Sequence, residues 1–154
     1  MNTLTTLTLD SPVGCLALRA RDDNIVALDW VDAMTPRPNI PVLTEAARQL
    51  DAYFAGTLTA FDLPLAPDGT LHQKKVWDEM KTIPFGGLRS YGDMATAIGS
   101  SARAVGTACG RNPIPIIVPC HRVIATGGGI GGYSGRGGLE TKRALLILEG
   151  VVLA

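Results

Sequence analysis

Apolar and polar residues alternate along the first 30 positions of the chain, which is the period of a half-buried β-strand. The alternation runs through residues 4–9, stops at the Asp-Ser-Pro turn of residues 10–12, and resumes over residues 13–18. A second turn at residues 22–24 leads into a third apolar segment at residues 25–30. Short turns favour antiparallel neighbours, so we predict a three-stranded antiparallel meander.

Residues 42–55 switch to the helical period, with an apolar face that includes Phe54 and with a glycine directly after the helix. The segment 61–69 contains two prolines and an Asp-Gly pair, so it is expected to be an irregular linker. The chain is therefore predicted to form two domains, over residues 1–69 and 70–154.

Short helices are expected in the second half of the chain. Thr70 and Gln73 have the spacing of a capping box, which predicts a helix directly after Thr70. Two further helices are expected over residues 91–98 and 101–109, joined by a turn at Gly99. Such a pair is typical of a helix-turn-helix, and a helical hairpin packed in a core is the alternative.

The predicted helix 101–109 has almost no side-chain bulk, because alanine, glycine and threonine fill most of its positions. A surface of this kind allows the backbone to approach another molecule closely, although its glycines lower helix stability. Arg103 is the one long cationic side chain among these small neighbours, and Arg111 follows at the far end. This pattern favours a helix that enters a groove.

Composition indicates a folded protein of the cytoplasm. The 154 residues are 46% hydrophobic, and no apolar stretch reaches the length of a membrane span. The N-terminus lacks the basic start and apolar core of a signal peptide. The three cysteines have no paired spacing, which suits a reducing compartment and argues against a disulfide framework.

The net charge of zero conceals an asymmetry between the two halves of the chain. Residues 1–69 contain 4 Lys/Arg and 9 Asp/Glu, a net charge of −5, whereas residues 70–154 contain 10 and 5, a net charge of +5. A basic half is the pattern expected where one domain meets a polyanion, and ordinary variation in surface charge is the alternative.

The most informative segment is Pro-Cys-His-Arg-Val at residues 119–123, which follows the proline-containing apolar run 112–118. The prolines fix the backbone, so the cysteine is held in place. The thiolate is the reactive form of cysteine, and a neighbouring imidazole is a common means of forming it. Cys120 and His121 are therefore candidate catalytic residues, and an inert buried cysteine is the alternative.

Eight of the thirteen residues at 126–138 are glycine, which indicates a loop whose backbone can approach a ligand. The loop lacks the Lys-Ser/Thr ending of a phosphate-binding loop, so nucleotide binding is not expected. A final helix is predicted over residues 139–149, with Leu145 and Leu148 facing inward.

Together these motifs resemble the O6-alkylguanine-DNA alkyltransferase family, also called the methylated-DNA–protein-cysteine methyltransferases. The resemblance covers residues 70–150 in the family's order, and the Pro-Cys-His-Arg-Val core is highly specific to that family. The segments that carry it are Pro84-Phe-Gly, Arg89-Ser-Tyr-Gly, Arg103-Ala-Val-Gly, Asn112-Pro-Ile-Pro-Ile-Ile-Val-Pro-Cys-His-Arg-Val, Gly132-Tyr-Ser-Gly and Leu148-Glu-Gly.

The resemblance implies an α+β fold. The N-terminal domain would be a small three-stranded antiparallel sheet with a helix, like ribonuclease H. The C-terminal domain would be mostly helical, with a winged-helix-like helix-turn-helix. The implied function is DNA repair by a single, irreversible transfer of an alkyl group from O6-alkylguanine, and from O4-alkylthymine, to a cysteine of the protein.

The family resemblance also implies roles for individual residues. Cys120 would attack the alkyl carbon, while His121, through a water, and Glu149 would take the thiol proton. Tyr91 would donate to the guanine, and Asn112 would brace the active segment. The residues expected to bind the substrate are Tyr133, Ser134, Val123 and Cys109. The residues expected to bind DNA are Arg103, Ala102, Ala104, Thr107, Arg111, Arg122, Ser90 and Tyr91.

The expected partner is double-stranded DNA, bound through its minor groove with the alkylated base flipped into the protein. The protein is expected to be a monomer in solution, with clustering on DNA as an open alternative. No cofactor and no membrane partner are expected. Cys15 and His72 are too few additional ligands for a zinc site, so no metal is expected either.

Two features depart from the family pattern. The loop at residues 135–138 is longer than the Gly-Gly that usually follows Tyr-Ser, and Cys109 stands where relatives often carry Asn or Met. Three other functions fit the sequence less well. A binding-only alkyltransferase-like protein would lack Cys120. A small-molecule thiol hydrolase or oxidoreductase would not need Arg103 on a smooth helix. A purely transcriptional helix-turn-helix would leave residues 119–123 unexplained.

Overall fold

A computed structural model describes residues 3–152 of the chain, so the outermost ends of both predicted domains, at residues 1–2 and 153–154, lie outside the described residues. The chain divides into two compact units, Met1–Asp68 and Gly69–Ala154. Each unit has its own buried apolar residues and is described by itself.

The N-terminal unit contains the predicted antiparallel meander, formed by β1 (Thr5–Leu9), β2 (Leu16–Arg21) and β3 (Asn24–Trp30) in the order β1-β2-β3. Leu7 pairs with Leu18, and Leu18 pairs with Leu28, so three buried leucines lie side by side across the sheet. The second strand begins later than expected, at Leu16. The chain turns before it at Gly14, whose φ of 114° favours glycine.

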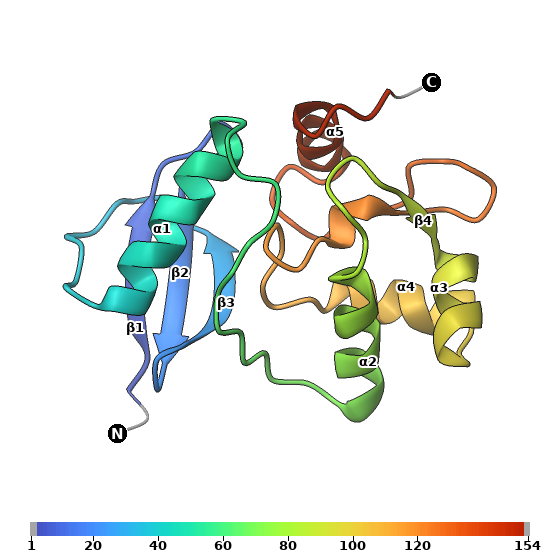
Figure 1. The fold of residues 1–154 in the computed structure, drawn as a ribbon, viewed down its shortest axis with the longest axis horizontal. Helices are drawn as coiled ribbons and strands as arrows, with labels where there is room; N and C mark the ends of the chain where they lie inside the picture. The colour runs from blue at the N-terminus through green and yellow to red at the C-terminus, as the bar shows by residue number, and fades with distance from the viewer. Residues whose placement is uncertain (1–2, 153–154) are drawn as a thin grey trace. The chain divides into compact units, whose positions relative to one another are not determined.

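Helix α1 (Pro41–Phe54) packs against all three strands of this sheet (Figure 1). Its buried face contains Leu43, Leu50 and Tyr53. The expectation that Phe54 faces inward is wrong, because Phe54 is half-exposed and the neighbouring Tyr53 is fully buried against the ring of Phe61. Positions three and four residues after Leu50 both lie near the same helical face, and packing selects the first of them.

The irregular segment 61–69 is partly attached to the sheet of the N-terminal unit. The Ile25 N–H donates to the carbonyl of Pro64, and the Ala66 N–H donates to the carbonyl of Ile25, at 2.8 and 2.9 Å. These bonds form a short parallel bridge between Ile25 and Leu65. Most of the predicted linker therefore belongs to the N-terminal unit.

In the C-terminal unit, helix α2 (Leu71–Met80) begins at the predicted capping box. Thr70 accepts from the Gln73 N–H, and the Gln73 side chain accepts from the Thr70 N–H. The buried face of α2 carries Trp77, whose indole N–H donates to the carbonyl of Ala108 at 2.9 Å. This bond fixes α2 against the helix that contains Ala108.

Two short helices follow as predicted, α3 (Tyr91–Ile98) and α4 (Ala102–Gly110). Ser90 caps α3 by accepting from the Asp93 N–H, and Ser101 caps α4 by accepting from the Ala104 N–H. Gly99 ends α3 with a φ of 69°, so a left-handed residue makes the turn between the helices. Helices α2, α3 and α4 pack together (Figure 1).

Strand β4 (Arg89–Ser90) forms a short parallel pair with β5 (Val123–Ile124). Strand β5 directly follows the 3-10 turn η1 (Cys120–Arg122), which contains the candidate cysteine and histidine. Helix α5 (Leu139–Leu148) then packs against η1.

The inward face of α5 differs in one position from the prediction. Leu145 is buried as expected, but Leu148 is only half-buried and Leu146 is buried in its place. Across residues 3–152, the helices are too short or too polar to cross a lipid bilayer.

Candidate active site

Asn112 holds the chain that leads to Cys120 in a compact turn. Its amide Nδ2 donates to the carbonyl of Val118 at 2.8 Å, and its Oδ1 accepts from the Ile114 N–H at 3.0 Å. Both bonds are buried, so they satisfy backbone groups that water does not reach. Ile116 adopts a φ of 73° inside this turn, a strained conformation for a β-branched residue. The turn therefore needs the bracing that Asn112 provides.

Cys120 begins the 3-10 turn η1 and is 4% exposed. Burial raises the pKa of its thiol, because the low-dielectric surroundings disfavour the thiolate. A hydrogen bond from the Asn112 side chain and the positive charge of Lys142 act in the opposite direction and lower the pKa. Burial is the largest effect, so the resting thiol is protonated and needs a base to become a nucleophile.

A buried charge network involves His121 and Arg122, the two residues that follow Cys120 in the turn η1. The His121 Nε2 and a carboxylate oxygen of Glu149 are 2.7 Å apart. The Arg122 Nε and Nη2 donate to the same carboxylate at 2.8 and 3.0 Å, while its Nη1 donates to the Ile83 carbonyl at 2.6 Å. Glu149 is 4% exposed at the end of α5, so it is not the surface carboxylate that its position at a helix end suggests.

His121 is held neutral in this network, with one ring nitrogen available for a proton. Burial lowers the pKa of the imidazole and outweighs the hydrogen bond and charge of Glu149, which raise it. Arg122 also lowers this pKa, and its charge balances that of the carboxylate. With Nε2 bound to Glu149, Nδ1 is buried and has no hydrogen-bond partner among residues 3–152. The neutral ring thus has a free basic nitrogen.

Arg122 and Val123, which the sequence predicts to contact DNA and the substrate, are both buried. Arg122 is 6% exposed, and its three hydrogen-bonding nitrogens donate to Glu149 and to the Ile83 carbonyl. The Val123 side chain is fully buried in β5, and its carbonyl accepts from Lys142 at 2.6 Å. Arg122 therefore holds Glu149 in place, and Val123 holds Lys142 in place.

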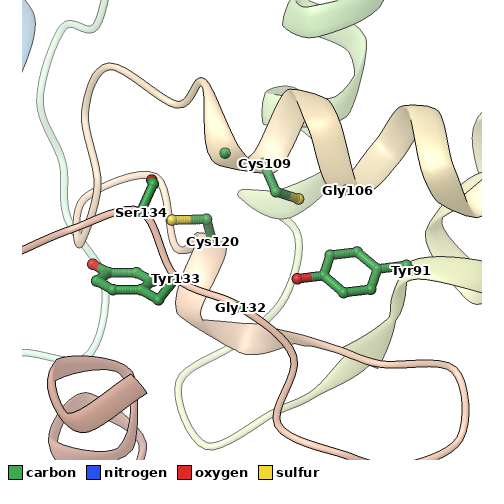
Figure 2. A pocket seen from close by; sticks show the side chains of 8 residues that line it. Tyr91, Gly106, Cys109, Cys120, Gly132, Tyr133 and Ser134 are labelled. Atoms are coloured by element: carbon green, nitrogen blue, oxygen red, sulfur yellow. The ribbon is translucent and has the colours of Figure 1, made fainter. Parts of the chain in front are cut away.

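A pocket of about 380 Å³ opens beside Cys120. In the view of Figure 2, Tyr91 lies on one side of Cys120 and Tyr133 and Ser134 lie on the other. The pocket brings together five predicted site residues from segments far apart in the sequence, and adds glycines from α4 and the glycine-rich loop. Its lining residues are Tyr91, Gly106, Cys109, Gly110, Cys120, Gly132, Tyr133 and Ser134.

Two groups in the pocket hold their protons at neutral pH. Burial raises the pKa of the Tyr91 phenol, so this hydroxyl can act as a hydrogen-bond donor. Burial also raises the pKa of the Cys109 thiol to about 12, and the thiolate of Cys120 adds to that effect. The Cys109 Sγ lies 3.6 Å from the Met80 Sδ. Cys109 is therefore a weak nucleophile beside the reactive one.

Lys142 is a site residue that sequence reasoning missed. Its side chain is fully buried, and its ammonium donates to the carbonyls of Val123 and Gly132 at 2.6 and 3.1 Å. A signal for it was present in the sequence. Lys142 is three residues before Leu145 and seven before Glu149, which places it on the inward face of α5.

Most of the predicted DNA-binding residues lie on one exposed helix. Ala102, Arg103, Thr107 and Arg111 are exposed on or beside α4, and Ala104 is partly exposed. The Ser90 hydroxyl is used as the cap of α3. A second hollow of about 410 Å³ lies along this side of α4. Its lining residues are Thr70, His72, Gln73, Ser101, Arg103, Ala104, Thr107 and Ala108.

Over residues 3–152, no three His, Cys, Asp or Glu side chains gather closely enough to hold a metal ion. The site offers a protonated thiol, a neutral imidazole held by a carboxylate, a phenol donor and a buried lysine. Such a set can generate a thiolate and stabilise a leaving group that gains negative charge.

Comparison with known proteins assigns both parts of the chain. Residues 71–151 match the family described as 6-O-methylguanine DNA methyltransferase, DNA binding domain, and residues 4–67 match its ribonuclease-like domain. A methylated-DNA–protein-cysteine methyltransferase of Mycolicibacterium paratuberculosis is 48% identical, with 92% of this chain and 90% of that protein covered. The constitutive enzyme of Bacillus subtilis is 44% identical, with 92% and 93% covered.

A crystal structure of Mycobacterium tuberculosis OGT in complex with DNA is similar in fold. Its TM-score is 0.84 at 47% identity, with 94% of this chain and 91% of that chain covered. The similarity therefore extends over both units of the chain.

Proposed function

The chain belongs to the 6-O-methylguanine DNA methyltransferase family, and we propose that it repairs DNA by moving the alkyl group of O6-alkylguanine, or of O4-alkylthymine, onto Cys120. The observation that carries this assignment of the nucleophile is the position of Cys120. Its thiol lines a pocket and follows directly on a braced turn, and it is next in sequence to a neutral imidazole held by a buried carboxylate.

The transfer begins with removal of the thiol proton. The free Nδ1 of His121 accepts this proton, directly or through a water, while Glu149 stabilises the imidazolium that forms. Arg122 holds Glu149 in place, because its guanidinium donates to both carboxylate oxygens. The Cys120 thiolate is thus formed only when the base accepts its proton.

The thiolate sulfur then attacks the alkyl carbon. A carbon–sulfur bond forms as the bond from that carbon to O6 breaks, and the electron pair of the broken bond stays on the guanine. The Tyr91 hydroxyl donates to the base as its negative charge develops, and Ser134 supplies a further donor at the pocket wall. The proton held by His121 balances the charge of the released guanine.

The product explains why a protein of this kind acts once. Alkylation converts Cys120 into a thioether, which is a poor leaving group and offers no direct route back to the thiol. Each molecule therefore accepts one alkyl group, and repair is limited by the amount of protein. A chain that only bound the lesion would not need a base beside Cys120.

The burial of Cys120 supports a mechanism in which the target base leaves the DNA helix. The alkyl carbon lies inside the duplex, whereas Cys120 is 4% exposed, so rotation of the nucleotide into the pocket would bring the two together. Unstacking costs a few kcal/mol and is easiest at a mispaired, damaged base. We place α4 in the minor groove, where its small residues permit close approach and Arg103 fills the gap left in the base stack.

A repair assay tests this function. The protein is titrated against a duplex that carries one O6-methylguanine in a restriction site that is cleaved only after repair. We expect cleavage to rise in proportion to protein and to stop at one repaired site per molecule. Cys120→Ala should abolish repair while Cys109→Ala, the matched change in the same pocket, retains it. Multiple turnovers, or repair by Cys120→Ala, would contradict the proposal.

A further inference from the structure

Lys142 is a fully buried lysine whose ammonium connects β5 with the glycine-rich loop. It donates to the carbonyl of Val123, directly after the active turn, and to the carbonyl of Gly132 in the pocket wall. Taking a lysine out of water costs several kcal/mol unless its charge is compensated. A residue placed at that cost, with two carbonyl partners beside the nucleophile, points to a use for its charge.

The same ammonium is close to the phenol of Tyr91. Its nitrogen lies 6.0 Å from the centre of the Tyr91 ring. The Gly132 N–H donates to the Tyr91 hydroxyl, while the Gly132 carbonyl accepts from Lys142. The backbone of Gly132 in the pocket wall is therefore held through both of its polar groups.

Gly131 packs closely against the side chains of Tyr91 and Lys142. Its φ is 76°, and a Cβ added there would lie 3.2 Å from the Tyr91 hydroxyl and 3.4 Å from the Lys142 nitrogen. The loop therefore reaches the pocket beside these two polar groups, which leave no free space for a side chain at Gly131.

We propose that Lys142 is a positioning residue for alkyl transfer, which holds the segment 131–134 against β5 and places a positive charge near the Cys120 thiolate. This inference rests on the proposed function for its role in repair, but its effect on the thiol can be measured without DNA. The lysine acts on the reaction through the loop and through its field, and it does not contact the alkyl group.

The charges of Lys142 and of the Cys120 thiolate attract each other. Burial raises the pKa of the Cys120 thiol, and Asn112 and Lys142 both lower it. Conversely, burial lowers the pKa of Lys142, and the thiolates of Cys120 and Cys109 raise it. Each group thus stabilises the charged form of the other. Removing the lysine must make the Cys120 thiolate harder to form.

The test measures the pH dependence of Cys120 alkylation by iodoacetamide in a background that carries Cys15→Ala and Cys109→Ala. Intact mass gives the rate, and peptide mapping confirms the site. Lys142→Met removes the charge at similar length, Lys142→Arg keeps it, and Arg143→Met removes an exposed charge from the next position of α5. Trp77 fluorescence checks that each variant is folded, and Lys142→Gln replaces the Met variant if that one is not.

We expect the midpoint of the profile to rise by about one pH unit in Lys142→Met, which is about a tenfold lower rate below the midpoint. Lys142→Arg should restore most of the difference, and Arg143→Met should match the parent. An unchanged midpoint in the folded Lys142→Met or Lys142→Gln variant would overturn the proposal, because a purely structural lysine would not shift the titration of the thiol.

Repair of an O6-methylguanine duplex by the same variants separates the two proposals. Lys142→Met should repair about tenfold more slowly than Arg143→Met at neutral pH. If the parent protein repaired no duplex but the thiol profile still shifted, the proposed function would fail while the effect of Lys142 on the Cys120 thiol held. If the parent repaired DNA and the profile did not shift, only the assignment of Lys142 would fail.

Discussion

Replacing Asn112 with alanine removes both side-chain hydrogen bonds that brace the turn at residues 112–118. The expected loss of stability follows from these two bonds. The change leaves the Val118 carbonyl and the Ile114 N–H buried without their partner. A buried polar group that loses its partner costs about 1–3 kcal/mol, so the two together predict a loss of about 2–6 kcal/mol in the free energy of unfolding. The strained φ of Ile116 places the result towards the upper end.

Urea unfolding followed by Trp77 fluorescence measures this loss within the C-terminal unit. Trp77 is buried there and bonded to Ala108, and Trp30→Phe removes the other tryptophan from the signal. With a slope of about 2 kcal/mol per molar urea, the midpoint should fall by about 1–3 M. Asn39→Ala removes an exposed asparagine from the N-terminal unit and serves as the control, expected to change stability by less than about 0.5 kcal/mol.

Asn112→Asp separates the two hydrogen bonds. The aspartate keeps an acceptor for the Ile114 N–H but has no donor for the Val118 carbonyl, which would then face a carboxylate oxygen. We expect this variant to be no more stable than Asn112→Ala. If the alanine variant unfolded at the same urea concentration as the control, the two bonds would not be what holds the turn, and the reasoning would be refuted.

Three further predictions concern the reaction. Arg103→Ala should slow repair in duplex DNA far more than reaction with free O6-benzylguanine, because only the duplex requires base extrusion; equal losses measured in single-turnover assays would exclude this role. Cys109→Ala should retain transfer, as measured by methyl incorporation, and complete loss would give Cys109 a role beyond pocket lining. The transfer rate should fall only below about pH 6.5, because burial lowers the pKa of His121 and the base stays neutral above its ordinary value; a half-maximal rate already at pH 7.5 would contradict this.

The secondary structure was predictable because it follows from short-range patterns. Alternation gave the three strands, and the capping box at Thr70 and Gln73 marked the start of α2 within one residue. The predictions of buried residues that fail concern positions where the local pattern is ambiguous. Tyr53 is buried instead of Phe54, and Leu146 instead of Leu148, because two adjacent residues can both lie near the buried face of a helix and only tertiary packing decides between them.

The charge network could not be derived from the residues alone. Arg122 binds the Ile83 carbonyl and the Glu149 carboxylate, groups 39 and 27 positions away along the chain. By itself the sequence favours a surface carboxylate for Glu149, and family resemblance supplied its catalytic role. Nothing local distinguishes Arg122 from an arginine that contacts DNA, and its burial becomes evident only when η1, the end of α5 and the segment after α2 are brought together.

The most direct test of the account is the mass of the intact protein after incubation with a duplex that carries one O6-methylguanine, followed by peptide mapping. The account predicts a single added methyl group per molecule, located on Cys120, with the lesion converted to guanine. A protein that binds the lesion duplex but keeps its original mass would contradict the account, because Cys120 would then line the pocket without accepting the alkyl group.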